Sequence, residues 1–170
     1  MKGEFSEMEE KDKPLKVKNT PAFRHSVPVQ MRFNDVDVLG HVNNSVYFSF
    51  YDLGKSAYFT TVRHGAVDWE KMDVVVANVN CNFYSPIYYG EPVSVVTRVE
   101  SIRDKSFKMH QRIINTVTNE IKSECATVMV SFDPVSKGSA QLSEKWVKAI
   151  KDYEGGNLLD KHSEEEQDKN

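Results

Sequence analysis

Four strand-like segments separated by short turns constrain the fold more than any other feature of this sequence. They cover residues 73–83, 93–102, 107–115 and 121–132. In the first segment, apolar residues at odd positions alternate with Asn78, Asn80 and Asn82, which is the period of a strand with one apolar face. Because consecutive strands joined by short turns pair antiparallel, the pattern predicts an antiparallel meander.

One long apolar segment precedes these strands. From Ser45 to about His64, apolar residues occupy nearly every face of a helix, including a run of aromatic residues: Tyr47, Phe48, Phe50, Tyr51, Tyr58 and Phe59. A helix that is apolar all round is buried in a core or between subunits. We expect Asn44 to cap its N-terminus and Gly65 to end it.

Two further elements complete the expected layout. Residues 24–33 alternate loosely and indicate a first strand, in which Pro28 is tolerated only at an edge or bulge. Ser143 is expected to cap a short closing helix, because Trp146, Ile150 and Tyr153 follow at helical spacing. The sequence thus predicts an α+β domain in which a curved antiparallel sheet surrounds one helix. The apolar helix and the unpaired sheet edges also predict that protomers pair.

Length and charge limit the classes of function. The 170 residues allow one domain with a substantial core. Residues 1–20 are expected to be a disordered charged tail, residues 21–153 the domain, and residues 154–170 an acidic tail. Within residues 21–150, 14 basic residues balance 13 acidic ones, which argues against a nucleic-acid partner. The absence of a long apolar run predicts a cytoplasmic protein without membrane insertion.

The sequence lacks the patterns of several common sites. Cys81 and Cys125 have no CxxC spacing, so we expect buried free thiols, and the scattered histidines form no metal-binding motif. GxSxG, P-loop and GxGxxG patterns are all missing. No metal or redox cofactor is expected.

A polar stretch lies immediately before the expected helix. It contains two carboxylates, a bend residue, an imidazole and two amides: Asp35, Asp37, Gly40, His41, Asn43 and Asn44. A carboxylate near a helix N-terminus stays ionised, because the helix dipole and free backbone N–H groups favour the anion. Polar groups at this density, where the chain enters a helix, indicate chemistry rather than packing.

These residues resemble signatures of the HotDog-fold acyl thioesterases. Asp35-x-Asp37-x-x-Gly40 is similar to the pattern of the 4-hydroxybenzoyl-CoA thioesterase-like group. Asp37-x-x-x-His41-Val-Asn-Asn-x-x-Tyr47 is similar to that of the acyl-ACP thioesterases. The strand and Tyr-x-x-Pro step over residues 79–91 and the basic hairpin at residues 103–107 resemble later landmarks, so the likeness covers roughly residues 22–150. Leu39 departs from it, since the acyl-ACP enzymes carry an active-site Asn there.

The resemblance implies an acyl-CoA thioesterase that hydrolyses a thioester to a free acid and coenzyme A, as a homodimer or homotetramer. It maps the catalytic acid onto Asp37, as nucleophile or general base, with His41 in support and helix-terminal N–H groups at the oxyanion. It assigns substrate binding to Asn43, Asn44, Tyr47, Asp52, Arg103, Lys105 and Lys108, the basic residues holding coenzyme A phosphates.

Each role has a structural alternative. Asp37 could cap the bend, and for Asp35 turn capping or a salt bridge is the preferred interpretation. His41 could bond to the loop, Asn43 and Asn44 could brace the loop and cap the helix, and Tyr47 could be a core residue. Asp52 could pair with a neighbouring base, and the basic residues could form a solvated face. Two other functions stay open: an acyl-ACP thioesterase and a non-catalytic acyl-CoA-binding module.

Overall fold

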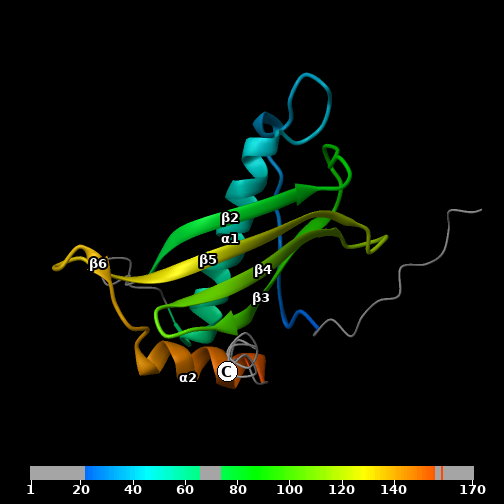
Figure 1. Cartoon of the computed structure of the whole chain (residues 1–170). Coiled ribbons are helices and arrows are strands. Elements are labelled where there is room, and N and C mark those ends of the chain that lie inside the picture. The colour runs from blue at the N-terminus through cyan, green and yellow to red at the C-terminus, as the bar shows by residue number, and fades with distance from the viewer. Residues whose placement is uncertain (1–21, 66–73, 156–157, 159–170) are drawn as a thin grey trace, which may run out of the picture.

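The computed structural model describes residues 22–65, 74–155 and 158. A sheet is formed by β1 (His25–Pro28), β2 (Val74–Phe83), β3 (Val93–Ile102), β4 (Ser106–Asn115) and β5 (Ile121–Asp133), with a short β6 (Gly138–Ser139) on β5. The helical elements are η1 (Phe33–Asp35), α1 (Asn44–Val62) and α2 (Glu144–Glu154). Figure 1 shows α1 running across one face of the curved sheet and α2 lying at its end. The predicted α+β architecture is confirmed.

The strand order is β1-β3-β4-β5-β2, and every pairing is antiparallel. β3, β4 and β5 form the predicted meander, but placing β2 beside β3 is wrong, because β2 pairs with β5. The connection over residues 84–92 is too long to be a tight turn, and it lets the chain pass from one edge to the other. β1 occupies the free side of β3. The first strand is shorter than predicted, and Pro28 ends it at the sheet edge, as its missing N–H requires.

Helix α1 packs mainly against β3 and buries one face: Tyr47, Phe50, Tyr51, Gly54, Tyr58, Phe59 and Val62. In the single chain the helix is not buried all round, because Ser49, Asp52 and Thr60 form an exposed polar strip. Burial of its other side between subunits stays a prediction. Phe48 and Leu53 are also exposed on this side.

The ends of α1 differ by one residue from the prediction. Asn43, not Asn44, is the N-cap: its extended backbone (φ −61°, ψ 138°) precedes the helix and its side-chain oxygen accepts the Ser45 N–H at 2.9 Å. At the other end, His64 rather than Gly65 adopts the left-handed conformation, with φ 56°. Asn43 and Asn44 are neighbouring amides that can each supply the N-terminal cap, and Gly65 still closes the last turn, since its N–H donates to the Thr60 carbonyl at 3.1 Å.

The closing helix α2 forms as predicted. Ser143 Oγ accepts the Trp146 N–H, and Trp146 and Ile150 are buried against the far half of α1. The fold extends past the domain boundary suggested at residue 153, since one Glu154 oxygen accepts the Tyr58 hydroxyl and the Val99 N–H, and Leu158 joins the core. The proposed tail at residues 1–20 lies outside the described residues, as does the proposed tail at residues 154–170 apart from residues 154, 155 and 158. Within the described ranges, no helix is long and apolar enough to cross a membrane.

Candidate active site

The polar stretch folds into a small hairpin that leads into α1. Val36 bridges to Val42, the Asp37 N–H donates to the His41 carbonyl at 2.9 Å, and the Gly40 N–H returns to the Asp37 carbonyl at 3.0 Å. Gly40 has φ +82°, a conformation that side chains rarely adopt, so this turn needs glycine. The geometry places Asp37 and His41 opposite each other at the base of the turn.

The Asp37 carboxylate is held by its own turn, since Oδ1 accepts the Leu39 N–H at 2.8 Å. Among the described residues, its Oδ2 receives no hydrogen bond. Asp37 therefore closes the bend with one oxygen and keeps the other for a further partner. This half-buried carboxylate therefore agrees with the capping interpretation, and its second oxygen is still available to react.

Asp35 has a structural task. Its Oδ2 accepts the Arg32 N–H at 2.7 Å and caps η1, while its carbonyl accepts the Asn43 N–H at 2.9 Å. The turn-capping interpretation of Asp35 is confirmed, and the residue fixes where the N-cap of α1 sits.

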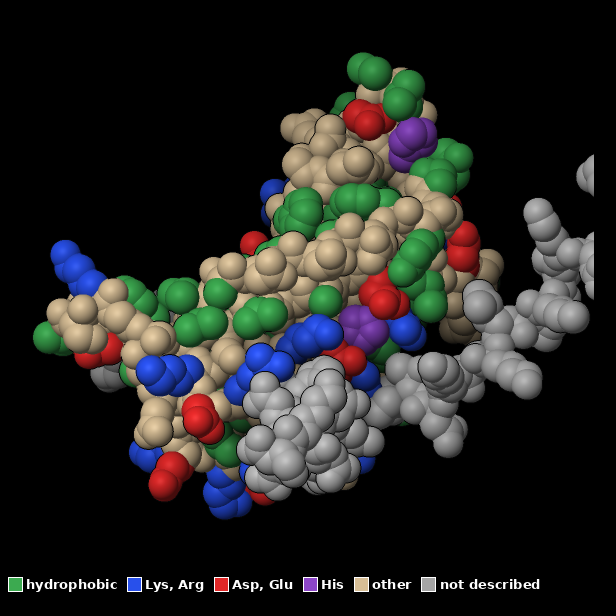
Figure 2. All heavy atoms as spheres, viewed as in Figure 1, with side chains coloured by type: hydrophobic (Ala, Val, Ile, Leu, Met, Phe, Trp, Pro, Cys, Tyr) green, Lys and Arg blue, Asp and Glu red, His purple; other side chains and the backbone are tan. Residues whose placement is uncertain are grey.

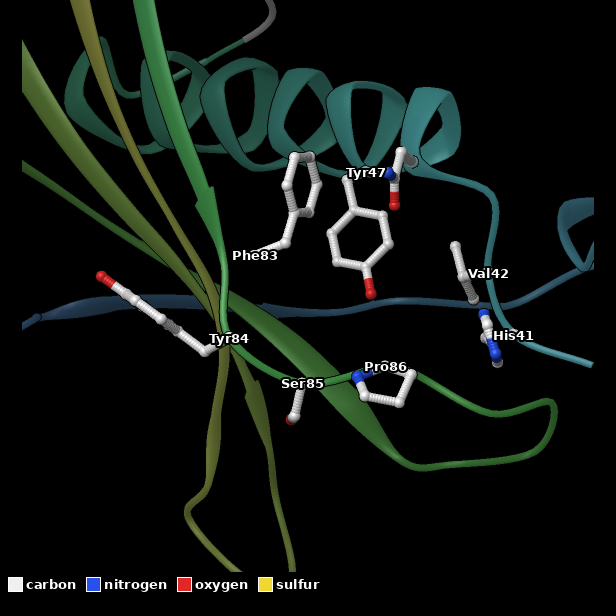
Figure 3. A pocket seen from close by; sticks show the side chains of 8 residues that line it. His41, Val42, Tyr47, Phe83, Tyr84, Ser85 and Pro86 are labelled. Carbon is white, nitrogen blue, oxygen red and sulfur yellow. The ribbon is translucent and has the colours of Figure 1, made fainter. Parts of the chain in front are cut away.

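A pocket of about 250 Å³ lies beside this hairpin, at the N-terminus of α1. Figure 3 shows the Tyr47 ring reaching from the helix toward Pro86, with Phe83 on one side and His41 and Val42 on the other. Its lining is mostly apolar and aromatic, with a few polar groups: His41, Val42, Asn44, Tyr47, Phe83, Tyr84, Ser85 and Pro86. This composition suits an apolar group with a polar end.

Two contacts hold the pocket wall formed by the chain after β2. The Val42 N–H donates to the Ile87 carbonyl at 2.8 Å, and the His41 and Tyr88 rings meet edge to face with centroids 5.8 Å apart. The hairpin and the segment after β2 thus form one wall, although they are more than 40 residues apart in sequence.

Tyr47 forms the inner wall and is only 2% exposed, with its ring edge to face with Phe83 at 5.0 Å between centroids. Burial raises the pKa of Tyr47, an effect that a hydrogen bond from the Ile87 backbone opposes. The hydroxyl therefore stays protonated at neutral pH and can act as a donor.

The buried side chain of Lys122 supports the pocket wall at Pro86. Lys122 Nζ contacts the Pro86 carbonyl at 3.2 Å and forms ion pairs with Glu120 at 2.9 Å and Glu91 at 3.2 Å. Burial alone would lower the pKa of Lys122, but the two carboxylates raise it, so the ammonium stays charged. These bonds fix Pro86 and its neighbours against β5.

Several predicted site residues lie away from the pocket. Asp52 is exposed on α1 and pairs with Lys55 at 2.8 Å, which agrees with its structural alternative. Arg103 and Lys105 lie in the β3–β4 turn, and Lys108 follows in β4, where it pairs with Glu100 at 3.0 Å. Phe83 pairs with Ser123, whereas Phe107 pairs with Met129, so about 20 Å of strand separates this turn from the pocket.

The structure thus brings together His41, Asn44 and Tyr47 from the predicted set, with Asp37 in the adjoining turn and Asn43 as the helix cap. Sequence reasoning missed Phe83, Ser85 and Pro86 as pocket residues. The available signal was the break at Ser85-Pro86 directly after an apolar strand. In the described part of the chain, no group of three His, Cys, Asp or Glu residues is arranged to hold a metal ion.

Comparison with known proteins decides the family. The model of the thioesterase-like superfamily matches residues 31–149. The chain belongs to this superfamily. The match includes the hairpin, the pocket, α1 and the whole meander.

Individual relatives agree with this assignment. The acyl-CoA thioester hydrolase YbgC of Escherichia coli O157:H7 is 27% identical over 138 residues, covering 78% of this chain and 98% of the relative. A thioesterase from Thermus thermophilus, solved with coenzyme A and Zn, is 31% identical with a TM-score of 0.69, covering 78% of this chain and 96% of the other. A 1,4-dihydroxy-2-naphthoyl-CoA thioesterase from Synechocystis shares the fold at 16% identity, with a TM-score of 0.68 over 75% of this chain and 95% of its own. The predicted HotDog fold is confirmed.

Proposed function

We propose that this chain is an acyl-CoA thioesterase that hydrolyses an acyl thioester to a free acid and coenzyme A. The observation that carries the proposal is the pocket at the N-terminus of α1, with Asp37 and His41 in one turn beside it, in a member of the thioesterase-like superfamily. The E. coli relative is an acyl-CoA thioester hydrolase, and the T. thermophilus relative was solved with coenzyme A, which supports the same substrate class.

Asp37 is the proposed reactive group. Either its carboxylate attacks the acyl carbon or it takes a proton from a water molecule that attacks. The Leu39 N–H orients Oδ1, and Oδ2 stays available for this step. The proposed reaction needs no metal or redox cofactor, and coenzyme A enters as part of the substrate.

The first turn of α1 supplies the proposed oxyanion donor. Asn43 uses its side chain and carbonyl to accept the N–H groups of Ser45 and Val46. The Asn44 N–H, one residue into the helix, is left to polarise the thioester carbonyl where the helix dipole is positive. Because Asn44 also lines the pocket, its N–H lies at the end of the cavity where the thioester carbonyl is proposed to bind.

We also propose that the active form contains at least two copies of the chain. β2 forms one edge of the sheet, and its apolar residues Val75, Val76, Val79 and Phe83 are 41–46% exposed. An open apolar edge of this length favours pairing with another chain. Binding of coenzyme A phosphates by Arg103, Lys105 or Lys108 requires such a second copy, since these residues lie far from the pocket of their own chain.

Release of free thiol from a panel of acyl-CoAs tests the proposal. The panel runs from acetyl to palmitoyl and includes aromatic acids, with the same acyl groups on acyl carrier protein for comparison. We expect turnover of at least one acyl-CoA above the rate without protein. Purified protein that binds these ligands and releases no thiol would instead be a binding module, and hydrolysis of the carrier-protein thioesters alone would make it an acyl-ACP thioesterase.

A further inference from the structure

The two cysteines of the chain lie directly opposite each other in the sheet. Cys81 of β2 pairs with Cys125 of β5, although 43 residues of chain separate them. Both thiols are free, and the proposed hydrolysis uses neither of them. An antiparallel sheet brings opposite residues close enough for their side chains to interact.

The hydrogen-bond pattern shows which kind of pair they form. The Tyr84 N–H donates to the Lys122 carbonyl at 2.9 Å, one step beyond the pairing of Phe83 with Ser123. Hydrogen-bonded and non-hydrogen-bonded pairs alternate along an antiparallel ladder. Counting back from Tyr84 makes Cys81 and Cys125 a non-hydrogen-bonded pair, for which the Cα atoms lie about 4.5 Å apart. Disulfides span Cα distances from about 4.4 to 6.8 Å.

The side chains share the inner face of the sheet, beneath α1. Cys125 belongs to the buried cluster around Tyr51 and Ile113, and Cys81 packs against that cluster. Cys81 Sγ lies 3.6 Å from Ser123 Oγ, and Cys125 Sγ lies 3.7 Å from Thr127 Oγ1. Burial raises the pKa of the Cys125 thiol to about 11, and the nearby Cys81 thiol acts in the same direction. The Cys81 thiol is therefore close enough to act on the Cys125 thiol.

We propose that Cys81 and Cys125 are a redox modification site that forms an intramolecular disulfide on reaction with a low-molecular-weight disulfide such as oxidised glutathione. The Cys81 thiolate attacks one sulfur of the reagent, which forms a mixed disulfide and releases one glutathione. Cys125 then attacks the Cys81 sulfur, forms the internal bridge and releases the second glutathione. In total the protein loses two protons and two electrons, and one glutathione disulfide becomes two thiols.

Burial sets the order of the two steps. In the single chain Cys81 is partly exposed, whereas Cys125 is buried, so attack begins at Cys81. The second step depends on deprotonation of Cys125, whose raised pKa makes it the slower step at neutral pH. Closure of the bridge should therefore accelerate as the pH rises from neutral toward the pKa of the Cys125 thiol, about 11.

The bridge would lie next to the candidate active site. Phe83, which lines the pocket, is two residues from Cys81 on the same face of β2. The bridge would join β2 to β5 at that point. This inference concerns the thiols alone and stands whether or not the chain hydrolyses thioesters.

The test treats the folded full-length protein with oxidised glutathione at pH 8, alkylates the remaining thiols and measures the intact mass. We expect a product lighter than the reduced protein by two hydrogen atoms, with no alkylation, and a peptide in which Cys81 is joined to Cys125. Cys125→Ser should stop at one glutathione adduct on Cys81, and Cys81→Ser should react much more slowly. A faster closure at pH 9 than at pH 7 is the expected pH dependence.

Three outcomes would overturn the proposal. One is a wild-type protein that keeps a stable glutathione adduct on Cys81 beside an unreacted Cys125. Another is a bridge between two chains. The third is a pair that closes only after the protein is unfolded in denaturant, which would show that the folded sheet holds the thiols apart.

Discussion

Side chains of the polar hairpin build the geometry in which they are proposed to act. Asp35, Asp37 and Asn43 each use one side-chain oxygen to accept a backbone N–H within three residues. Such local bonds compete with regular secondary structure, which is why the chain bends here before α1 begins. The capping and catalytic roles of Asp37 are therefore compatible, because each requires a different oxygen atom.

Glu154 lies near the end of the domain, yet we expect it to contribute strongly to the free energy of unfolding. One of its oxygens accepts both the Tyr58 hydroxyl at 2.7 Å and the Val99 N–H at 2.8 Å. Glu154→Ala leaves both donors without an acceptor, so we expect a loss of about 2–4 kcal/mol in the free energy of unfolding. Chemical denaturation measures it, and Glu154→Gln, which keeps an acceptor oxygen, should lose less. Equal stability of the Ala variant and the wild type would contradict this role.

Only part of the candidate site could be predicted from the sequence, because some of its residues are brought together by long-range contacts. Residues 35–47 are local, so their spacing predicts a polar turn, a cap and a buried aromatic residue without tertiary information. Ser85 and Pro86 are placed at the pocket by long-range contacts, such as the Val42 bond to Ile87 and the Lys122 bond to Pro86, which no local pattern encodes. The distance of Lys108 from the pocket of its own chain was not predictable for the same reason, since it depends on strand register.

Among the elements, α1 and β2 show what periodicity can and cannot predict. The β3, β4 and β5 boundaries agree with the alternation to within one residue, because tight turns separate these strands. The partner of β2 was not predictable from alternation, which gives a strand its faces but not its neighbour. The caps of α1 shifted by one residue because Asn43 and Asn44 are chemically equal candidates.

Gly54 marks the closest approach of α1 to the sheet. A Cβ atom there would lie 2.5 Å from Val95 Cγ1 and 2.8 Å from Gln111 Nε2. Ala favours a helix over Gly by about 1 kcal/mol, but overpacking a fixed contact costs about 1–3 kcal/mol. We therefore expect Gly54→Ala to lower the thermal unfolding midpoint.

Thr60→Ala is the matched control for Gly54→Ala, since Thr60 is exposed on the same helix. It should leave the midpoint unchanged or raise it slightly. A Gly54→Ala variant more stable than the wild type would show that α1 can move away from β3 at little cost.

For the whole molecule, the distribution of surface groups suggests assembly. Figure 2 shows hydrophobic side chains over the region of β2 and β5, and Lys and Arg side chains grouped nearer α2. The pocket is lined by Phe83, Ser85 and Pro86 at the C-terminal end of β2. Figure 1 shows the β3–β4 turn at the opposite end of the sheet. In a single copy the apolar pocket therefore lies far from the basic groups. In two copies joined along β2, the basic groups of one copy could serve the pocket of the other.

Val79→Lys tests this assembly. Val79 lies on β2 and is 41% exposed, so a charge there would have to be desolvated if another chain covers the strand. We expect sedimentation to show more monomer at micromolar concentration and thiol release to fall with it. Val135→Lys, at a position 90% exposed beyond β5, should change neither quantity. A wild type that is active as a monomer would rule the assembly out.

The most direct test of the account is the turnover of Asp37→Asn on the best acyl-CoA substrate. The amide keeps the oxygen that accepts the Leu39 N–H, so the hairpin should persist while the reactive carboxylate is lost. We predict that kcat falls by at least about 10²-fold, the lower end of what general acid–base catalysis contributes, with far less change in KM. His41→Ala should cost less, and Cys81→Ser should retain the chemistry. A folded Asp37→Asn variant with near wild-type kcat would contradict the account and leave the polar hairpin as a purely structural turn.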